Sequence, residues 1–148
     1  MAARKPLVLI SGEIAQLPAG DTIAAAASEV DIITATNGDA TPHAIGDVVY
    51  ISAASTVKKA KADAAGTKDA IAIAAAAITN ATSGPYQTDG IVSGLTGLTA
   101  GAVYYLSAGT AGVMTTTAPS TVGQYVVRLG IALSATELEL TIQRAIAL

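Results

Sequence analysis

Short apolar stretches alternate with turn-forming residues along most of this 148-residue chain. Gly, Pro, Asn, Ser and Thr interrupt the apolar pattern at Gly66, 80–85, 94–101, 109–112 and 118–123. Such spacing predicts strands of a few residues each, as in all-β sandwiches and barrels. A parallel α/β sheet would need long crossover segments between its strands. We therefore predict an all-β fold, a small antiparallel β-sandwich or barrel.

The clearest strand pattern lies near the C-terminus. Between residues 137 and 144, Leu138, Leu140 and Ile142 alternate with polar residues, which predicts a half-buried strand with one apolar face. We take these three side chains as candidates for a contact between copies of the chain. A second strand is predicted at 46–52, after turn signals at 37–39 and 41–42.

One Ala-rich segment is ambiguous. Residues 69–78 consist mostly of Ala, which favours a helix, but Ile71 and Ile73 alternate as they would in a strand. We choose the strand, because its small side chains would let another sheet approach closely. Residues 24–27 predict at most one helical turn, since β-branched residues soon follow.

Residues 1–23 differ from the rest of the chain. Two prolines and two glycines interrupt this segment, so it predicts an extended arm with its own turn, reaching at most about 65 Å. The alternative is a first strand packed on its own domain, and residues 24–148 form a single β domain in either case. The arm residues expected to contact a neighbouring molecule are Arg4, Lys5, Pro6, Leu7, Val8, Leu9, Ile10 and Leu17.

Two stretches of the domain match at a constant offset. Residues 46–53, Gly-Asp-Val-Val-Tyr-Ile-Ser-Ala, correspond to 101–108, Gly-Ala-Val-Tyr-Tyr-Leu-Ser-Ala. Each is followed by a predicted hairpin and a short apolar strand. The domain contains either two related β units, 46–78 and 101–134, or a chance similarity in a chain rich in Ala, Gly, Val and Ser.

Composition restricts the kind of core that this chain can build. Apolar types make up 51% of the residues and charged types 13%, which excludes a disordered polyelectrolyte. The chain has no Phe and no Trp, so its core must come from Val, Ile, Leu and Ala. Such small side chains bury little apolar area per residue, and we expect association between subunits to add stability.

Charge and hydropathy exclude several classes of partner. A net charge of −3 offers no attraction to phosphate, which argues against nucleic acid. The apolar run at 70–78 is shorter than the roughly 20 residues that span a bilayer, and the run at 7–10 is too short for a signal-peptide core. Without Cys there are neither disulfides nor thiolate metal sites. We expect a soluble protein, assembled in a cytosol, with no membrane partner.

Residues that commonly carry catalysis are sparse. His43 is the only histidine, so a multi-histidine metal site is excluded, and its place beside Pro42 in a turn predicts a surface residue. Ser55 and Lys58 fit S-x-x-K without the other partners of that motif, which we attribute to chance. The Gly-rich segment 94–101 lacks the Lys-Ser or Lys-Thr pair of a P-loop. We predict no enzyme activity, no cofactor and no metal.

Charged side chains leave two weaker possibilities. Asp39, Asp47 and Asp89 in loops could bind calcium, although an EF-hand-like run of ligands is absent. The basic cluster consists of Lys58, Lys59, Lys61 and Lys68. On a hairpin this cluster would be a solvated tip, and the alternative is a binding site for an acidic patch on a neighbouring protein.

Segments in a particular order resemble structural proteins of tailed bacteriophages. Residues 5–12, Lys-Pro-Leu-Val-Leu-Ile-Ser-Gly, and 14–21 resemble the start of tail-fibre and head-decoration proteins. The later part is similar to a small β module of the same proteins, at 46–52, 89–90, 98–101, 104–107, 122–123 and 129–132. The resemblance covers most of the chain and implies a homotrimeric virion component without catalytic residues.

A free-standing module of this length fits a capsid decoration, or cement, protein. Such a protein would bind the outer surface of the head shell as a homotrimer and stabilise the shell. Its expected partners are further copies of itself and the major capsid protein or another virion protein, and its expected location is the virion. The alternative is a tail-fibre, head-fibre or baseplate adaptor, and the rival from another class is an enzyme such as a small hydrolase.

Overall fold

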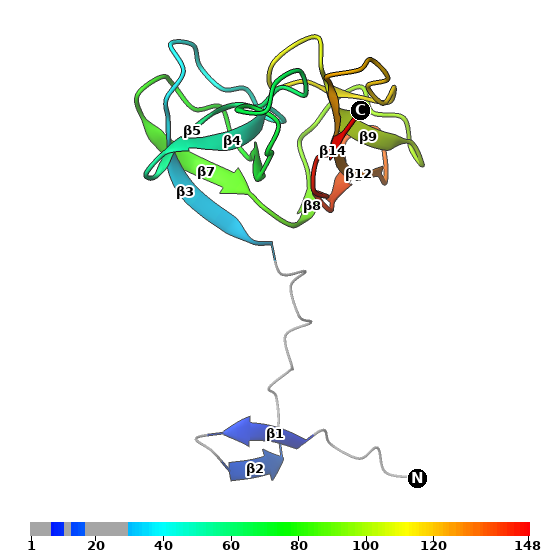
Figure 1. Cartoon of the computed structure of the whole chain (residues 1–148). Helices are drawn as coiled ribbons and strands as arrows, with labels where there is room; N and C mark the ends of the chain where they lie inside the picture. The colour runs from blue at the N-terminus through cyan, green and yellow to red at the C-terminus, as the bar shows by residue number, and fades with distance from the viewer. Residues whose placement is uncertain (1–6, 11–12, 17–29) are drawn as a thin grey trace.

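The computed structural model describes residues 7–10, 13–16 and 30–148, and these residues form strands, turns and loops without a helix (Figure 1). The strands are β1 (Leu7–Ile10), β2 (Glu13–Gln16), β3 (Ile32–Asn37), β4 (Val48–Ala53), β5 (Thr56–Lys59), β6 (Ala72–Ala74), β7 (Ser83–Gln87), β8 (Gly90–Val92), β9 (Val103–Leu106), β10 (Met114–Thr115), β11 (Tyr125–Val126), β12 (Arg128–Ala132), β13 (Leu138–Leu140) and β14 (Ile146–Ala147). The prediction of an all-β fold is confirmed.

β1 and β2 form an antiparallel hairpin within the predicted arm. Its register pairs Leu7 with Gln16 and Ile10 with Glu13. The residues between the two strands, 11–12, lie outside the described residues. The structure does not describe the remaining arm residues, which are Arg4, Lys5, Pro6 and Leu17. The helical turn predicted at 24–27 also lies outside the described residues.

The first half of the domain is a closed barrel in the order β3-β5-β4-β6-β7. β3 closes it by pairing antiparallel with β7 and parallel with β5. Successive residues of a strand face opposite sides, and on β4 Val49 packs inside the barrel with Val57 and Tyr86. Val48 instead packs outward, against the second half of the domain.

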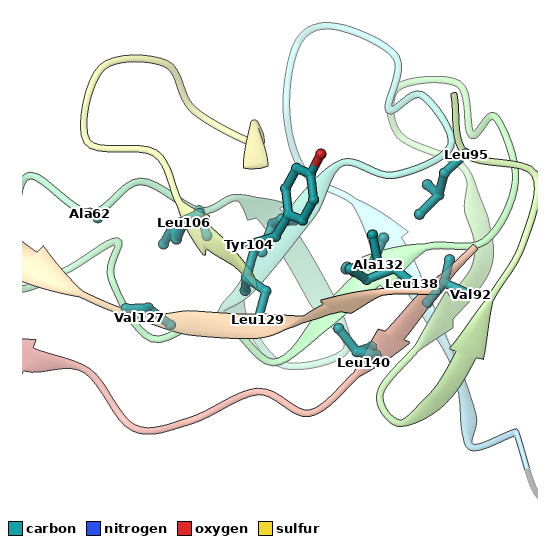
Figure 2. Close-up of a cluster of buried hydrophobic side chains, with 13 residues drawn as sticks. Ala62, Val92, Leu95, Tyr104, Leu106, Val127, Leu129, Ala132, Leu138 and Leu140 are labelled. Carbon is teal, nitrogen blue, oxygen red and sulfur yellow. The ribbon is translucent and has the colours of Figure 1, made fainter. Parts of the chain in front are cut away.

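The second half is an open sheet in the order β10-β9-β12-β13-β8, and β11 pairs separately with β14. Its side chains Leu106, Leu129 and Leu140 form the main core (Figure 2). Val48 and Ile73, from the outer face of the barrel, belong to the same core. The outer face of the barrel and the open sheet therefore share this core, whereas the barrel interior has a separate one.

Both halves have the same strand order. If the five strands of the barrel are numbered along the chain, their spatial order is third, second, fourth, fifth and first, as β5-β4-β6-β7-β3. The strands of the open sheet, β10-β9-β12-β13-β8, have the same spatial order when they are numbered in this way without β11. The four neighbouring pairs in each of these runs are antiparallel. The matching sequences 46–53 and 101–108 lie on the second strand of each half.

Backbone hydrogen bonds repeat in the two halves as well. Gly46 N–H donates to the Ala74 carbonyl at 2.9 Å, and Gly101 N–H donates to the Ala132 carbonyl at 2.8 Å. In return, Ala74 N–H donates to the Asp47 carbonyl at 2.9 Å, and Ala132 N–H donates to the Ala102 carbonyl at 3.0 Å. Both glycines have positive φ, 93° and 79°, which glycine adopts without strain. These shared contacts favour two related units over a chance similarity.

Two of the predicted strands are shorter than expected. Within 69–78 only β6 is a strand, and within 137–144 only β13. The predicted alternation is confirmed, because Leu138 and Leu140 are fully buried and the residue between them is exposed. Both leucines face the core of their own chain, which leaves their side chains no exposed surface for a contact with another copy. Ile142 is half-buried and packs against the same core.

Candidate functional site

A chain of hydrogen-bonded polar side chains lies inside the barrel. Nδ1 of His43 lies 2.9 Å from the Tyr86 hydroxyl oxygen, and Nε2 lies 2.9 Å from a carboxylate oxygen of Asp39. The same carboxylate oxygen accepts a hydrogen bond from the Lys59 backbone N–H at 2.8 Å. With a neutral imidazole, Nε2–H donates to the carboxylate and the Tyr86 O–H donates to Nδ1.

Asn37 fixes the turn that carries two of these side chains. Its amide nitrogen donates to the carbonyls of Thr41 and Ile78 at 3.0 and 3.1 Å, and its oxygen accepts the Asp39 N–H at 2.8 Å. The last contact is the Asx turn that Asn favours. His43 then pairs with Ile78 through an isolated antiparallel bridge. The turn predicted at 37–39 is thus confirmed.

The prediction that His43 lies on the surface is wrong. The exposed fractions of His43 and Asn37 are both 0%. Burial is tolerated because both ring nitrogens have partners, and no buried side-chain nitrogen or oxygen in the described residues lacks one. The two matching segments could have indicated the burial of His43. At their constant offset, His43 aligns with the apolar Leu98, which is half-buried against the main core.

Tyr86 is the part of this network that the sequence did not indicate. Burial raises the pKa of Tyr86 to about 12, and the charges of Asp39 and Asp47 add to the shift. The phenol therefore stays protonated near neutral pH and remains a hydrogen-bond donor. Tyr86 and His43 have no exposed surface. The network connects β7 to the turn after β3, where the Asp39 side chain is 24% exposed.

Two of the three loop carboxylates proposed for calcium, those of Asp39 and Asp47, are engaged by protein groups. Asp39 binds His43 and a backbone N–H, as described above. Asp47 accepts the Ala44 N–H at 2.8 Å and pairs with the Lys59 ammonium at 2.9 Å. Across the described part of the chain, no three His, Asp or Glu side chains gather in a way that could hold a metal ion.

The predicted basic cluster does not form a hairpin tip. Lys58 and Lys59 lie on β5, and Lys61 follows in the next loop. Lys61 pairs with Asp63 at 2.6 Å. Lys68 pairs with Asp69 at 2.6 Å, at the edge of an open hollow of about 280 Å³ beside the C-terminal segment. These carboxylates offset much of the positive charge that an acidic partner would need.

A cleft lies where the barrel meets the open sheet. Its volume is about 270 Å³, and it is lined by Ile45, Gly46, Asp47, Leu95, Thr96, Gly97, Leu98, Tyr104, Gly112, Val113 and Met114. The side chains are mainly apolar, while three glycines leave backbone groups accessible. Small-molecule pockets usually measure roughly 300–1,000 Å³, so this cleft fits one or two side chains of a partner better than a whole ligand.

Nine of the eleven large apolar side chains exposed among the described residues fall into three groups, and the other two are Ile51 and Leu133. One group, Val30, Ile32, Ile33 and Ile91, lies at the starts of β3 and β8; a second, Ile45 and Val113, borders the cleft; a third, Val122, Ile146 and Leu148, surrounds the β11–β14 pair. Single exposed apolar residues are ordinary, but groups of them mark contact surfaces. These groups replace Leu138 and Leu140 as candidates for contacts between subunits.

Comparison with known proteins leaves the family open. No family model, curated protein or solved structure matches the chain. Among the described residues there is no helix with the length and apolar character needed to cross a membrane.

Proposed function

We propose that this protein is a bacteriophage capsid decoration protein, which binds the outer surface of the head shell as a homotrimer and stabilises the shell. The observation that carries the proposal is the ordered resemblance to phage structural proteins, which covers most of the chain. Its segments 46–52 and 104–107 fall on β4 and β9, the equivalent second strands of the two halves. These two segments of the resemblance therefore lie on strands that the two halves of the domain have in common.

The distribution of chemistry agrees with a role in assembly. His43 and Tyr86 are buried, the loop carboxylates of Asp39 and Asp47 are paired, and the cleft suits side chains of a partner. Exposed apolar groups occur at the start of β3, beside the cleft and at β14. A protein of this kind acts through surfaces that fit other subunits.

Energetics explain why several copies would act together. Burying the four apolar side chains of β1 yields about 6–12 kcal/mol, at about 1.5–3 per side chain. Ordering roughly ten residues of the arm costs about 10–20 kcal/mol. One arm's side chains are therefore insufficient, and main-chain pairing together with three linked arms would make attachment stable.

Binding to purified shells tests the proposal. Wild-type protein should sediment with undecorated shells in tens to hundreds of copies and raise the temperature at which the shells open. A variant that lacks residues 1–20 should remain a folded trimer and lose this binding. Equal occupancy by the truncated chain would refute the role of the arm. Labelled protein found only at one vertex or on the tail would instead identify the fibre or baseplate alternative.

A further inference from the structure

The outer face of the open sheet carries apolar side chains that pack in neither core. The inner face of this sheet holds the leucines of the main core. On the outer face, the strand register places one row of side chains across β8, β13, β12 and β9, which consists of Ile91, Glu139, Ile131 and Val103. The three apolar members of this outer row belong to neither of the hydrophobic cores formed by the described residues.

Two side chains of the outer row have counterparts in the first half of the domain. Val103 on β9 is opposite Ile131 on β12, and in the barrel Val48 on β4 is opposite Ile73 on β6. Both valines are the third residue of their matching segment. Both isoleucines precede the alanine whose carbonyl accepts the N–H of the glycine that begins that segment. The two pairs therefore occupy equivalent positions in the two halves.

The first half shows what covers a face of this kind. Val48 and Ile73 are fully buried, because the inner face of the open sheet packs on them. Their counterparts Val103 and Ile131 are only half-buried, and Ile91 beside them is 38% exposed. Apolar side chains gathered on one surface mark a contact site. Since a β unit of this chain covers the equivalent face of the barrel, a β unit of a second copy is the fitting cover for the outer row.

Two opposite charges on the outer face favour a second copy that presents the same face. Arg128 is opposite Tyr105, which lies two residues after Val103 and therefore on the same side of the sheet. Glu139 belongs to the outer row itself. The four ion pairs among the described residues involve neither Arg128 nor Glu139. A face with one positive and one negative side chain is self-complementary across a twofold axis, because each charge of one copy meets the opposite charge of the other.

We infer that two copies of this chain pack through the outer faces of their open sheets across a twofold axis. The apolar side chains of the outer row form the centre of the contact, and Arg128 of each copy faces Glu139 of the other. Burial of the apolar side chains provides the attraction, and the opposite charges fix the relative orientation of the two sheets.

This contact goes beyond the proposed function. It joins two copies whether each is free or already part of a trimer, and it involves neither residues 1–23 nor attachment to a shell. The wild-type protein should therefore contain an even number of chains in solution. A particle of only two chains would keep this contact and contradict the homotrimer. A particle of one or three chains at every concentration would overturn the inference and leave the decoration function open.

Charge reversal in the full-length chain tests the twofold contact directly. Arg128→Glu alone and Glu139→Arg alone should each halve the solution mass measured by analytical ultracentrifugation at low ionic strength, since each variant places like charges opposite one another. The two single variants, once mixed, should pair with each other, and the variant with both changes should pair with itself. Arg144→Glu reverses a charge on the C-terminal segment and should leave the mass unchanged. Unchanged masses for the single variants, or no pairing in the mixture and the double variant, would overturn the inference.

A polar substitution in the outer row provides an independent measurement. Ile131→Thr keeps a β-branched side chain on the strand, and each contact loses two isoleucine side chains. The dissociation constant of the pair should therefore rise about tenfold or more. Ile51→Thr makes the same substitution at a 60% exposed position of β4 and should leave the dissociation constant unchanged. Thermal scans establish that both variants are folded, and equal dissociation constants for the two would contradict the inference.

Discussion

Replacing Tyr86 with Phe probes the buried network with the smallest possible change. The substitution removes one oxygen atom and leaves the ring inside the barrel. The lost hydroxyl is the hydrogen-bond partner of Nδ1 of His43, whose side chain has no exposed surface. The variant therefore leaves a buried polar atom without a partner, while the packing of the barrel interior stays nearly the same.

The expected cost follows from that unpaired nitrogen. Leaving a buried polar group unsatisfied costs about 1–3 kcal/mol, and a domain of this kind has a total unfolding free energy of about 5–15 kcal/mol. At about 4 °C per kcal/mol for a chain of this length, we expect Tyr86→Phe to lower Tm by about 4–12 °C. The loss should come from the barrel, where β7 is joined to the turn after β3.

Urea unfolding followed by circular dichroism, together with a thermal scan, measures the effect. Tyr50→Phe is the matched control, because Tyr50 is half-buried against the main core and its hydroxyl has no hydrogen-bond partner among the described residues. Its stability should stay within about 0.5 kcal/mol of wild type. Adding His43→Leu to Tyr86→Phe should cost less than the sum of the two single changes, since both partners are then removed. Equal stability of Tyr86→Phe and Tyr50→Phe would refute the reasoning.

Three further predictions concern the same fold. The pKa of Tyr86 is about 12 in the folded protein and about 10 in the unfolded chain. The stability that the protonated phenol contributes is therefore complete below pH 10 and is lost as the pH rises towards 12. Urea titrations should show that the free energy of unfolding falls by up to about 2–3 kcal/mol over this range in wild type and not in Tyr86→Phe. Gly130→Ala should prevent folding or cost at least about 3 kcal/mol, because a Cβ there would overlap the Glu139 carbonyl. Gly66→Ala, where a Cβ meets no atom within 4 Å, is the control by thermal scan. Asn37→Ala removes three hydrogen bonds and should cost about 2–4 kcal/mol in urea unfolding, and a loss below 0.5 would contradict its role in the turn.

Local patterns were sufficient for much of the fold. Apolar stretches with frequent turn residues predicted the all-β class, and Asn37 with Gly38 predicted the turn that the structure contains. The matching segments 46–53 and 101–108 left two related units and a chance similarity open, and the repeated strand order favours related units. Each of these features depends on a few consecutive residues, whose backbone preferences act over short distances.

The sequence by itself determined that Leu138 and Leu140 share a buried face, but the tertiary structure decided what covers that face. Alternation reports which side of a strand is apolar and is silent on whether the cover is the same chain or another. His43 shows the same limit, because its burial depends on Tyr86, 43 residues away along the chain. Long-range strand pairing likewise decided that the first half closes into a barrel and the second half stays an open sheet. The strands that pair are far apart in the sequence and meet only when the chain is folded.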